Sequence, residues 1–325
     1  MSRTPLAVAG AAPLAFVDEH GYVFFDDGWR VEWWVLGDDY WHVPAASTTV
    51  RQRYVDNSPI TETAIRVPGG DVVYRVGAAV SGDGLPCIVA ECENTAAIPV
   101  ALGLACVSPD DAVSLDVHPV THSNTWRGAL RSDATVLPDL ATVARGWLAL
   151  ARQGAQITTN DPSIDDALTA ARCQLLLRQG GLLADGKKAD RAEAAAAANA
   201  LTLLGYDDAA GALRLSARLR PARKGLPLVP GTTDGVVAAT RAQMVDDTHN
   251  GIDIAPGFSR DWVGRSVDVR DLPTNHGLVS FAIRWHGEHP ALLWEVDAGK
   301  PVRVRATAIK PDWETSDPTG EALLA

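Results

Sequence analysis

The stretch 279-VSFAIRWHGEHPALLWEV-296 contains two runs in which apolar residues alternate with small or polar ones. The alternating apolar residues are Val279, Phe281, Ile283 and Trp285 in the first run and Leu292, Trp294 and Val296 in the second. Successive side chains of a strand point to opposite faces, so this alternation predicts two strands with one apolar face. The segment Gly287–Pro290 between them predicts the turn of a β-hairpin.

The same alternation recurs in the first half of the chain, most clearly in 29-WRVEWWVL-36. Because Trp33 and Trp34 are adjacent in this predicted strand, they must point to opposite faces. Further β-branched runs follow at short spacing, separated by turn signals such as Asp56-Asn57-Ser58-Pro59. The sequence therefore predicts an antiparallel β-sandwich domain over residues 1–155.

A change to helical spacing marks residues 156–224. Asp161-Pro162-Ser163 predicts a helix start, and 187-KKADRAEAAAAANALTLLG-205 predicts an alanine-rich helix that Gly205 ends. A third helix is expected just after it, giving a segment of about three helices. Residues 225–325, which contain the hairpin, predict a β-rich region, so the expected fold class is α+β.

Composition limits the class of protein and its partners. The chain has 325 residues, a net charge of −11 and 46% hydrophobic residues, which is typical of a globular protein. The negative charge argues against a nucleic-acid partner, and no apolar run reaches the roughly 20 residues of a membrane span. Pro5, Gly10 and Pro13 interrupt the apolar N-terminus, so we expect no signal peptide.

Four cysteines without a CxxC pair argue against a disulfide framework or a structural zinc site. We therefore expect reduced thiols and a cytoplasmic protein. No P-loop, GxGxxG or GxSxG motif is present, and we expect neither a cofactor nor a metal.

The loop 37-GDDYWHVP-44 is the first candidate site, because it follows the tryptophan-rich strand. Its candidate ligand-binding residues, together with the preceding strand, are Trp34, Asp38, Asp39, Trp41 and His42. Flat aromatic rings beside carboxylates suit a sugar, whose C–H face stacks on indole while its hydroxyls bind carboxylates. The alternative is that both neighbouring tryptophans are packed, one in the sandwich and one against the helices.

His286 and Glu288, with His289, form the second candidate site at the hairpin turn. The simplest interpretation is that these polar residues are solvated at the turn. A catalytic or sugar-binding role for His286 or Glu288 is the alternative. A metal role lacks a third ligand on a rigid element.

Three stretches together resemble one enzyme family. They are 88-IVAECENTAAIPVALGLACV-107, 189-ADRAEAAAAANALTLLGYDDAA-210 and 284-RWHGEHPALLWEV-296. They look like six-hairpin (α/α toroid) glycosidases, such as glucoamylase-like and glycogen-debranching-like enzymes, and like uncharacterised actinobacterial proteins of that architecture. The resemblance implies carbohydrate metabolism. The predicted helical segment is much too short for a complete toroid, and no residue here matches a catalytic signature of the family.

Three functional hypotheses follow. The first is a non-catalytic or degenerate carbohydrate-active protein that binds a glycan or a protein partner. The second is a glycoside hydrolase with an inter-domain carboxylate site, using residues such as Asp38, Asp39, Glu288 or Glu295. The third is a structural or assembly protein without a small ligand. The sequence leaves the oligomeric state open.

Overall fold

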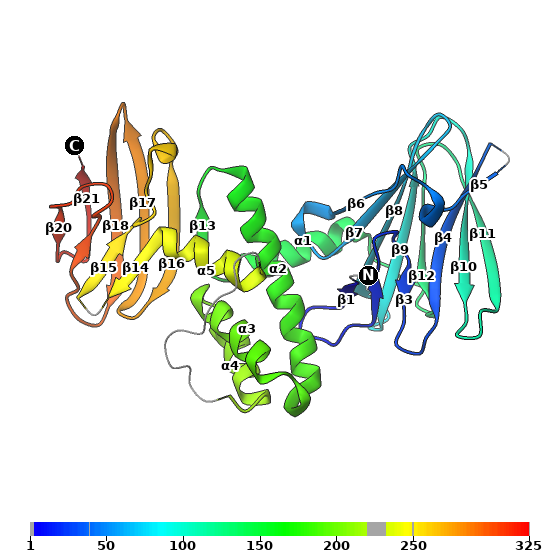
Figure 1. Cartoon of the computed structure of the whole chain (residues 1–325), viewed down its shortest axis with the longest axis horizontal. Helices are drawn as coiled ribbons and strands as arrows, with labels where there is room; N and C mark the ends of the chain where they lie inside the picture. The colour runs from blue at the N-terminus through cyan, green and yellow to red at the C-terminus, as the bar shows by residue number, and fades with distance from the viewer. Residues whose placement is uncertain (1–2, 39, 220–231, 249, 325) are drawn as a thin grey trace. The chain divides into compact units, whose positions relative to one another are not determined.

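The computed structural model describes residues 3–38, 40–219, 232–248 and 250–324. The chain forms two compact units, Met1–Leu148 (unit 1) and Ala149–Ala325 (unit 2), coloured blue to green and green to red in Figure 1. The described residues contain five α-helices and four sheets, so the α+β class is confirmed. No helix in these ranges is long and apolar enough to cross a membrane.

Unit 1 contains two antiparallel sheets. Sheet A comprises β1 (Thr4–Leu6), β2 (Ala15–Val17), β3 (Val23–Phe24), β4 (Arg30–Gly37), β10 (Val100–Val107) and β11 (Val113–Val120) in that order, with β5 (Tyr40–His42) also paired to β4. Sheet B comprises β12 (Thr125–Leu130), β9 (Pro86–Asn94), β8 (Gly70–Val80), β7 (Thr61–Val67) and β6 (Arg51–Tyr54) in that order. One apolar core joins the two sheets, as a β-sandwich requires.

The tryptophan pair of β4 divides between the two faces of sheet A, as predicted. Trp33 is fully buried, stacks on Tyr74 of sheet B at 4.8 Å and donates from Nε1 to the carbonyl of His20 at 2.9 Å. Trp34 points to the other face and is half-buried. The side chains on the inner face of β4 therefore form part of the core, and those on its outer face lie outside this core.

Helix α1 (Leu140–Ala151) corrects the prediction that residues 1–155 are all β. Its apolar residues recur at helical spacing, and Leu140 and Ala144 pack on Ile60 and Val89 at the outer face of sheet B. The helix begins beside a buried carboxylate, since the amide of Leu140 donates to Glu91 Oε1 at 3.0 Å.

Three helices occupy the predicted helical segment, and a further helix follows it. They are α2 (Pro162–Asp185), α3 (Arg191–Leu203), α4 (Asp207–Ser216) and α5 (Thr233–Met244). The chain thus has five described helices rather than about three, because α1 and α5 lie outside the predicted segment. Asp161 caps α2 by accepting from the amide of Ser163, and Gly205 follows α3 with a φ of 77°.

The sequence of α5 fits a strand as well as a helix, since it contains two adjacent valines and Gly235. The amide of Gly235 donates a capping hydrogen bond to Oγ1 of Thr232, and Val237 and Met244 are buried, so this segment forms a helix. The Pro- and Gly-rich stretch 224–231 before it lies outside the described residues.

Unit 2 also contains two sheets. Sheet C comprises β13 (Gln156–Thr158), β16 (Val267–Thr274), β17 (Gly277–His286), β18 (His289–Ala298) and β21 (Thr319–Leu323) in that order. Sheet D comprises β14 (Val245–Thr248), β15 (Gly251–Ile254), β19 (Val304–Arg305) and β20 (Glu314–Thr315) in that order. The C-terminal region is therefore β-rich, as predicted, apart from α5.

The hairpin 279–296 is formed by β17 and β18, which appear in orange in Figure 1. Its apolar face enters a core that also contains residues of α2, α3, α4 and α5. The predicted helical segment 156–224 and the predicted C-terminal region 225–325 therefore share one hydrophobic core. What remains exposed on sheet C is its other face.

Candidate functional site

Trp34 and Trp41 lie together on the outer face of sheet A. Their rings are 6.1 Å apart in an edge-to-face arrangement. The ring of Trp41 covers Gly103, where any Cβ would come within 2.7 Å of the indole. Both tryptophans are half-buried. Neither is a core residue nor a fully exposed platform, so the structure lies between the two sequence interpretations.

The other residues of this candidate site lie at the adjoining edge. The rings of Tyr40 and His42 are 4.2 Å apart, and Tyr40 is 53% exposed. Nε2 of His42 is buried and makes no hydrogen bond with any described residue. Asp38 is exposed with a positive φ of 53°, and Asp39 lies outside the described residues. An aromatic rim thus stands beside at least one solvated carboxylate.

One side of the outer face is covered by the chain itself. The hydroxyl of Tyr22 accepts a hydrogen bond at 3.2 Å from the amide of Ala45, in the short helical turn after β5. Burial raises the pKa of Tyr22, and the nearby carboxylate of Glu32 adds to the increase. The indole N–H of Trp34 lies near this hydroxyl without forming a hydrogen bond of acceptable geometry.

The other side of the outer face is open and apolar. Val113, Leu115 and Val117 of β11 are 57%, 42% and 49% exposed. The register pairs them with Val107, Ala105 and Gly103 of β10, whose own neighbours in β4 include Trp34 and Glu32. The sheet A outer face is defined here as the residues Trp34, Leu36, Trp41, Ala101, Gly103, Ala105, Val113, Leu115 and Val117. The described part of the chain leaves its β11 side uncovered.

The second candidate site lies in unit 2, at the tip of the β17–β18 hairpin. His286 pairs in register with His289 across a two-residue turn, whose Gly287 has a φ of 63°. His286, Glu288 and His289 are all exposed, and their side chains form no hydrogen bond or ion pair with any described residue. This is the geometry of a solvated turn.

Among the described residues, one group has metal-ligand spacing, namely Asp18, Glu19 and His20. The Asp18 carboxylate accepts hydrogen bonds from the amides of His20 and Tyr22, each at 2.9 Å. These bonds close the local turn, so the carboxylate is already used by the backbone.

Alternating charges cross the outer face of sheet B in register. From β6 to β12 the row consists of Arg53, Glu62, Arg75, Glu91 and Arg127, and we call it the charge ladder. The Glu62 carboxylate accepts from Nε of Arg53 at 2.6 Å and from Nε of Arg75 at 2.7 Å. Glu91 Oε1 accepts from Nε of Arg127 at 2.8 Å.

Both carboxylates of the charge ladder are buried, with Glu62 and Glu91 7% and 6% exposed. Burial alone would raise the pKa of Glu62, but hydrogen bonds from Arg53 and Arg75 outweigh burial and hold that pKa below its ordinary value. Each acid of the ladder is paired with a guanidinium, so neither is available as a nucleophile or a general acid.

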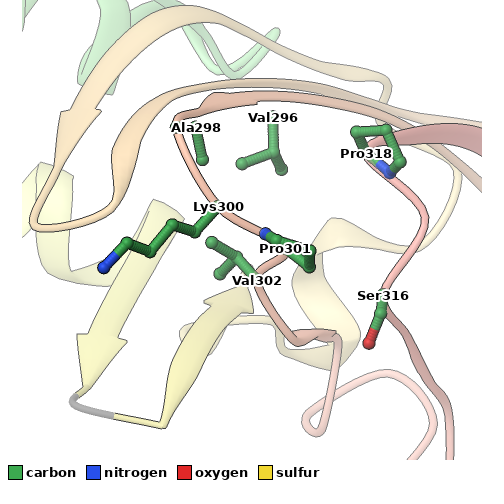
Figure 2. A pocket seen from close by; sticks show the side chains of 8 residues that line it. Val296, Ala298, Lys300, Pro301, Val302, Ser316 and Pro318 are labelled. Atoms are coloured by element: carbon green, nitrogen blue, oxygen red, sulfur yellow. The ribbon is translucent and has the colours of Figure 1, made fainter.

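Described residues of unit 2 line at least two hollows. One, of about 350 Å³, lies over the outer face of sheet C and is lined by Asp268, Arg270, Ser280, Leu293 and Glu295, among others. The other, of about 230 Å³, lies at the end of β18. Figure 2 shows its largely apolar wall, with Lys300 on one side and Ser316 on the other. Neither hollow contains Trp34, Asp38, Trp41, His42, His286 or Glu288.

The apolar residues of β11 and Arg270 are candidates that no sequence motif indicated. The alternation in 113-VSLDVHPV-120 shows that one face of this strand is apolar, but only the sheet pairing shows that this face points away from the core. No family model, curated protein or solved structure matches the chain.

Proposed function

We propose that this protein is a non-catalytic binding module that docks a protein partner on the sheet A outer face, and that the partner is a second copy of the chain. The observation that carries the proposal is the orientation of β11. Val113, Leu115 and Val117 point outward and are about half exposed, whereas Ser114 and Asp116 occupy the other face. Contiguous apolar residues on a surface are typical of interaction sites.

The chemistry of this face favours a protein over a sugar. Along β11 the face presents only aliphatic side chains, and the indole N–H of Trp34 is buried. Hydroxyl groups of a sugar lying there would lose water without gaining partners, which costs free energy. A second apolar face has no such groups to desolvate. Completing the burial of the three β11 side chains contributes roughly 2–4 kcal/mol per copy.

The charges at this end of the sandwich are compatible with self-docking. Arg30 is paired with Glu32 at 2.8 Å and with Asp111 at 3.4 Å. Docking of two copies therefore does not place an unpaired charge from these three residues against the other copy. Pro119 and Asp116 in β11 oppose edge-to-edge strand pairing. Docking face to face, as in a twofold dimer, is the arrangement that remains.

A glycan is the second candidate ligand. The aromatic rim at Tyr40 and His42 favours it, whereas the sheet A outer face does not. Tyr40 is exposed and lies next to His42 and Trp41, with Asp38 beside them. An aromatic ring with a carboxylate nearby suits one sugar ring. The resemblance to six-hairpin glycosidases supports this candidate.

The hydrolase alternative requires two free carboxylates facing one cleft. In the described part of sheet C, Asp268 and Glu295 line the same hollow, but Asp268 is paired with Arg284 at 2.6 Å. The buried acids of the charge ladder are paired as well. The pairing of these acids supports a non-catalytic protein. The four free cysteines support action in the cytoplasm, and the net charge of −11 supports partners other than nucleic acid.

Sedimentation of the purified chain over a range of concentrations tests the proposal. The wild type is expected to form a dimer, and Leu115→Asp and Val117→Asp are each expected to shift it to monomer. Val80→Asp is the matched control, since Val80 is also about half exposed and lies at the end of β8 in sheet B.

A wild-type chain that stays monomeric at every concentration would overturn self-docking. A glycan array in parallel examines the second candidate. Binding that is lost in Tyr40→Ala and kept in Leu115→Asp would move the function to the rim. We expect no binding to any glycan on the array, and a dimer that Leu115→Asp dissociates.

A further inference from the structure

The hollow on sheet C lies on the face that the hydrophobic core does not use. Val269, Phe281 and Trp294 point to the core, so their neighbours in sequence point outward. The outward side chains at the centre are small, namely Ser280 and Ala282. This leaves a depression of about 350 Å³, within the range of small-ligand sites.

A β-bulge sets the chemistry of one wall. The register of β16 with β17 shifts between Val269 and Leu272, so Arg270 and Asp271 both stand opposite Ser280. Asp271 has a positive φ of 54°, and its amide donates to Oγ of Ser280 at 2.9 Å. Bulges re-aim side chains, and here Arg270 is exposed at the hollow.

Glu295 forms the opposite wall. It pairs in register with Ser280, so it lies two strands from Arg270, at a backbone separation of about 10 Å. Neither side chain has a hydrogen-bond or ion-pair partner among the described residues. The third charged residue that lines the hollow, Asp268, is neutralised by Arg284 at 2.6 Å. The hollow therefore offers one free cation and one free anion.

We propose that this hollow binds a small zwitterion of the α-amino-acid class with an apolar side chain. The ligand's carboxylate pairs with the Arg270 guanidinium, which presents several donors in a fixed fork. Its ammonium pairs with Glu295, and its side chain lies on Ala282 and Leu293, which is 37% exposed. This site is in unit 2 and does not depend on the proposed function of unit 1.

The arrangement favours a zwitterion over a sugar or a simple acid. Two aromatic residues line the hollow, Phe281 and Trp294, but both side chains belong to the hydrophobic core and are only 3% and 8% exposed, so a sugar ring has no open aromatic plane on which to stack. A ligand with a carboxylate alone would leave Glu295 unpaired and repelled. A ligand with both charges satisfies both walls at once.

Titration of the full-length chain with L-leucine, followed by amide NMR shifts, tests the proposal. Two analogues accompany it, leucinol without the carboxylate and 4-methylpentanoate without the ammonium. Leucine is expected to shift the resonances of β16, β17 and β18 saturably, and each analogue is expected to bind more weakly. The variants Arg270→Met and Glu295→Gln are expected to weaken leucine binding roughly three- to tenfold, since half-exposed charges contribute less than buried ones.

The cross-over between variants and analogues makes the test specific. Arg270→Met is expected to leave leucinol binding unchanged, and Glu295→Gln is expected to leave 4-methylpentanoate binding unchanged. Arg303→Met and Glu314→Gln in sheet D serve as the matched controls, because both side chains are exposed. The proposal is overturned if leucine gives no saturable shift, if the analogues bind as well as leucine, if glucose shifts the same resonances instead, or if the controls weaken binding equally.

Discussion

Replacing Arg75 by Met removes the central cation of the charge ladder. Glu62 would keep only Arg53, whose side chain is 76% exposed, against 24% for Arg75. Breaking a buried ion pair from one side costs about 3–5 kcal/mol, and an exposed pair contributes about 0.2–1 kcal/mol. Because Glu62 is buried but keeps one partner, we expect Arg75→Met to lower the free energy of unfolding by about 2 kcal/mol.

Thermal unfolding followed by circular dichroism measures this loss. For a domain of this size, about 2 kcal/mol corresponds to a fall of roughly 4–8 °C in the transition of unit 1. Arg66→Met is the matched control on the same sheet, because its side chain is 61% exposed and contacts Asp71 at 3.4 Å. We expect it to cost less than about 0.5 kcal/mol.

The pH dependence gives the sign of the electrostatic effect. The pKa of Glu62 is lowered in the folded protein, so its pairing stabilises the fold above the unfolded pKa of about 4.3. That stabilisation is lost as pH falls through the lower folded value. The difference between wild type and Arg75→Met should therefore be largest at neutral pH and shrink in acid.

A double variant separates the loss of the Glu62–Arg75 ion pair from the loss of packing around the Arg75 side chain. Adding Glu62→Gln to Arg75→Met should restore part of the stability, because no uncompensated charge remains buried. If Arg75→Met costs no more than Arg66→Met, or if its cost does not change with pH, the ladder does not stabilise unit 1 as argued.

Three further outcomes follow from the described contacts. Gly103→Ala should displace the ring of Trp41, cost about 1–3 kcal/mol and shift the tryptophan fluorescence, because its Cβ would stand 2.7 Å from the indole. Asp190→Ala should cost about 1 kcal/mol in urea unfolding, because this carboxylate caps α3. Burial raises the pKa of Cys92 to about 12 and that of Cys173 to about 11, so at pH 8 both thiols should react with a disulfide reagent only after unfolding.

Local alternation predicted much of the fold, because it depends on residues close in sequence. The hairpin 279–296 and the opposite orientations of Trp33 and Trp34 follow from the period of two alone. The sequence did not predict helix α1, and the sequence of α5 fits a strand as well as a helix. In both segments, β-branched and glycine residues are compatible with a strand. Only their packing and the Thr232 cap select the helix.

The candidate sites were harder to predict from the sequence, because they depend on strand register. The charge ladder joins five strands, and no stretch of sequence shows that Glu62 stands opposite both Arg53 and Arg75. The hollow on sheet C depends on a β-bulge at Arg270 and Asp271, and the sequence contains no glycine there that would predict a bulge. Trp34 and Trp41, which the sequence did select, belong to the sheet A outer face but are not its most exposed part.

The order of strands in sheet C has a consequence for how unit 2 is assembled. Strands β17 and β18 are joined by two residues and form by local closure, whereas β13 ends at Thr158 and must pair with β16, which begins at Val267. Closing a loop of about 100 residues costs roughly 2 kcal/mol more chain entropy than closing one of about ten. The edge of the sheet is therefore completed late, after the helices in between have folded, and during synthesis β13 must wait for β16, which leaves the ribosome only after α2 to α5 have been made.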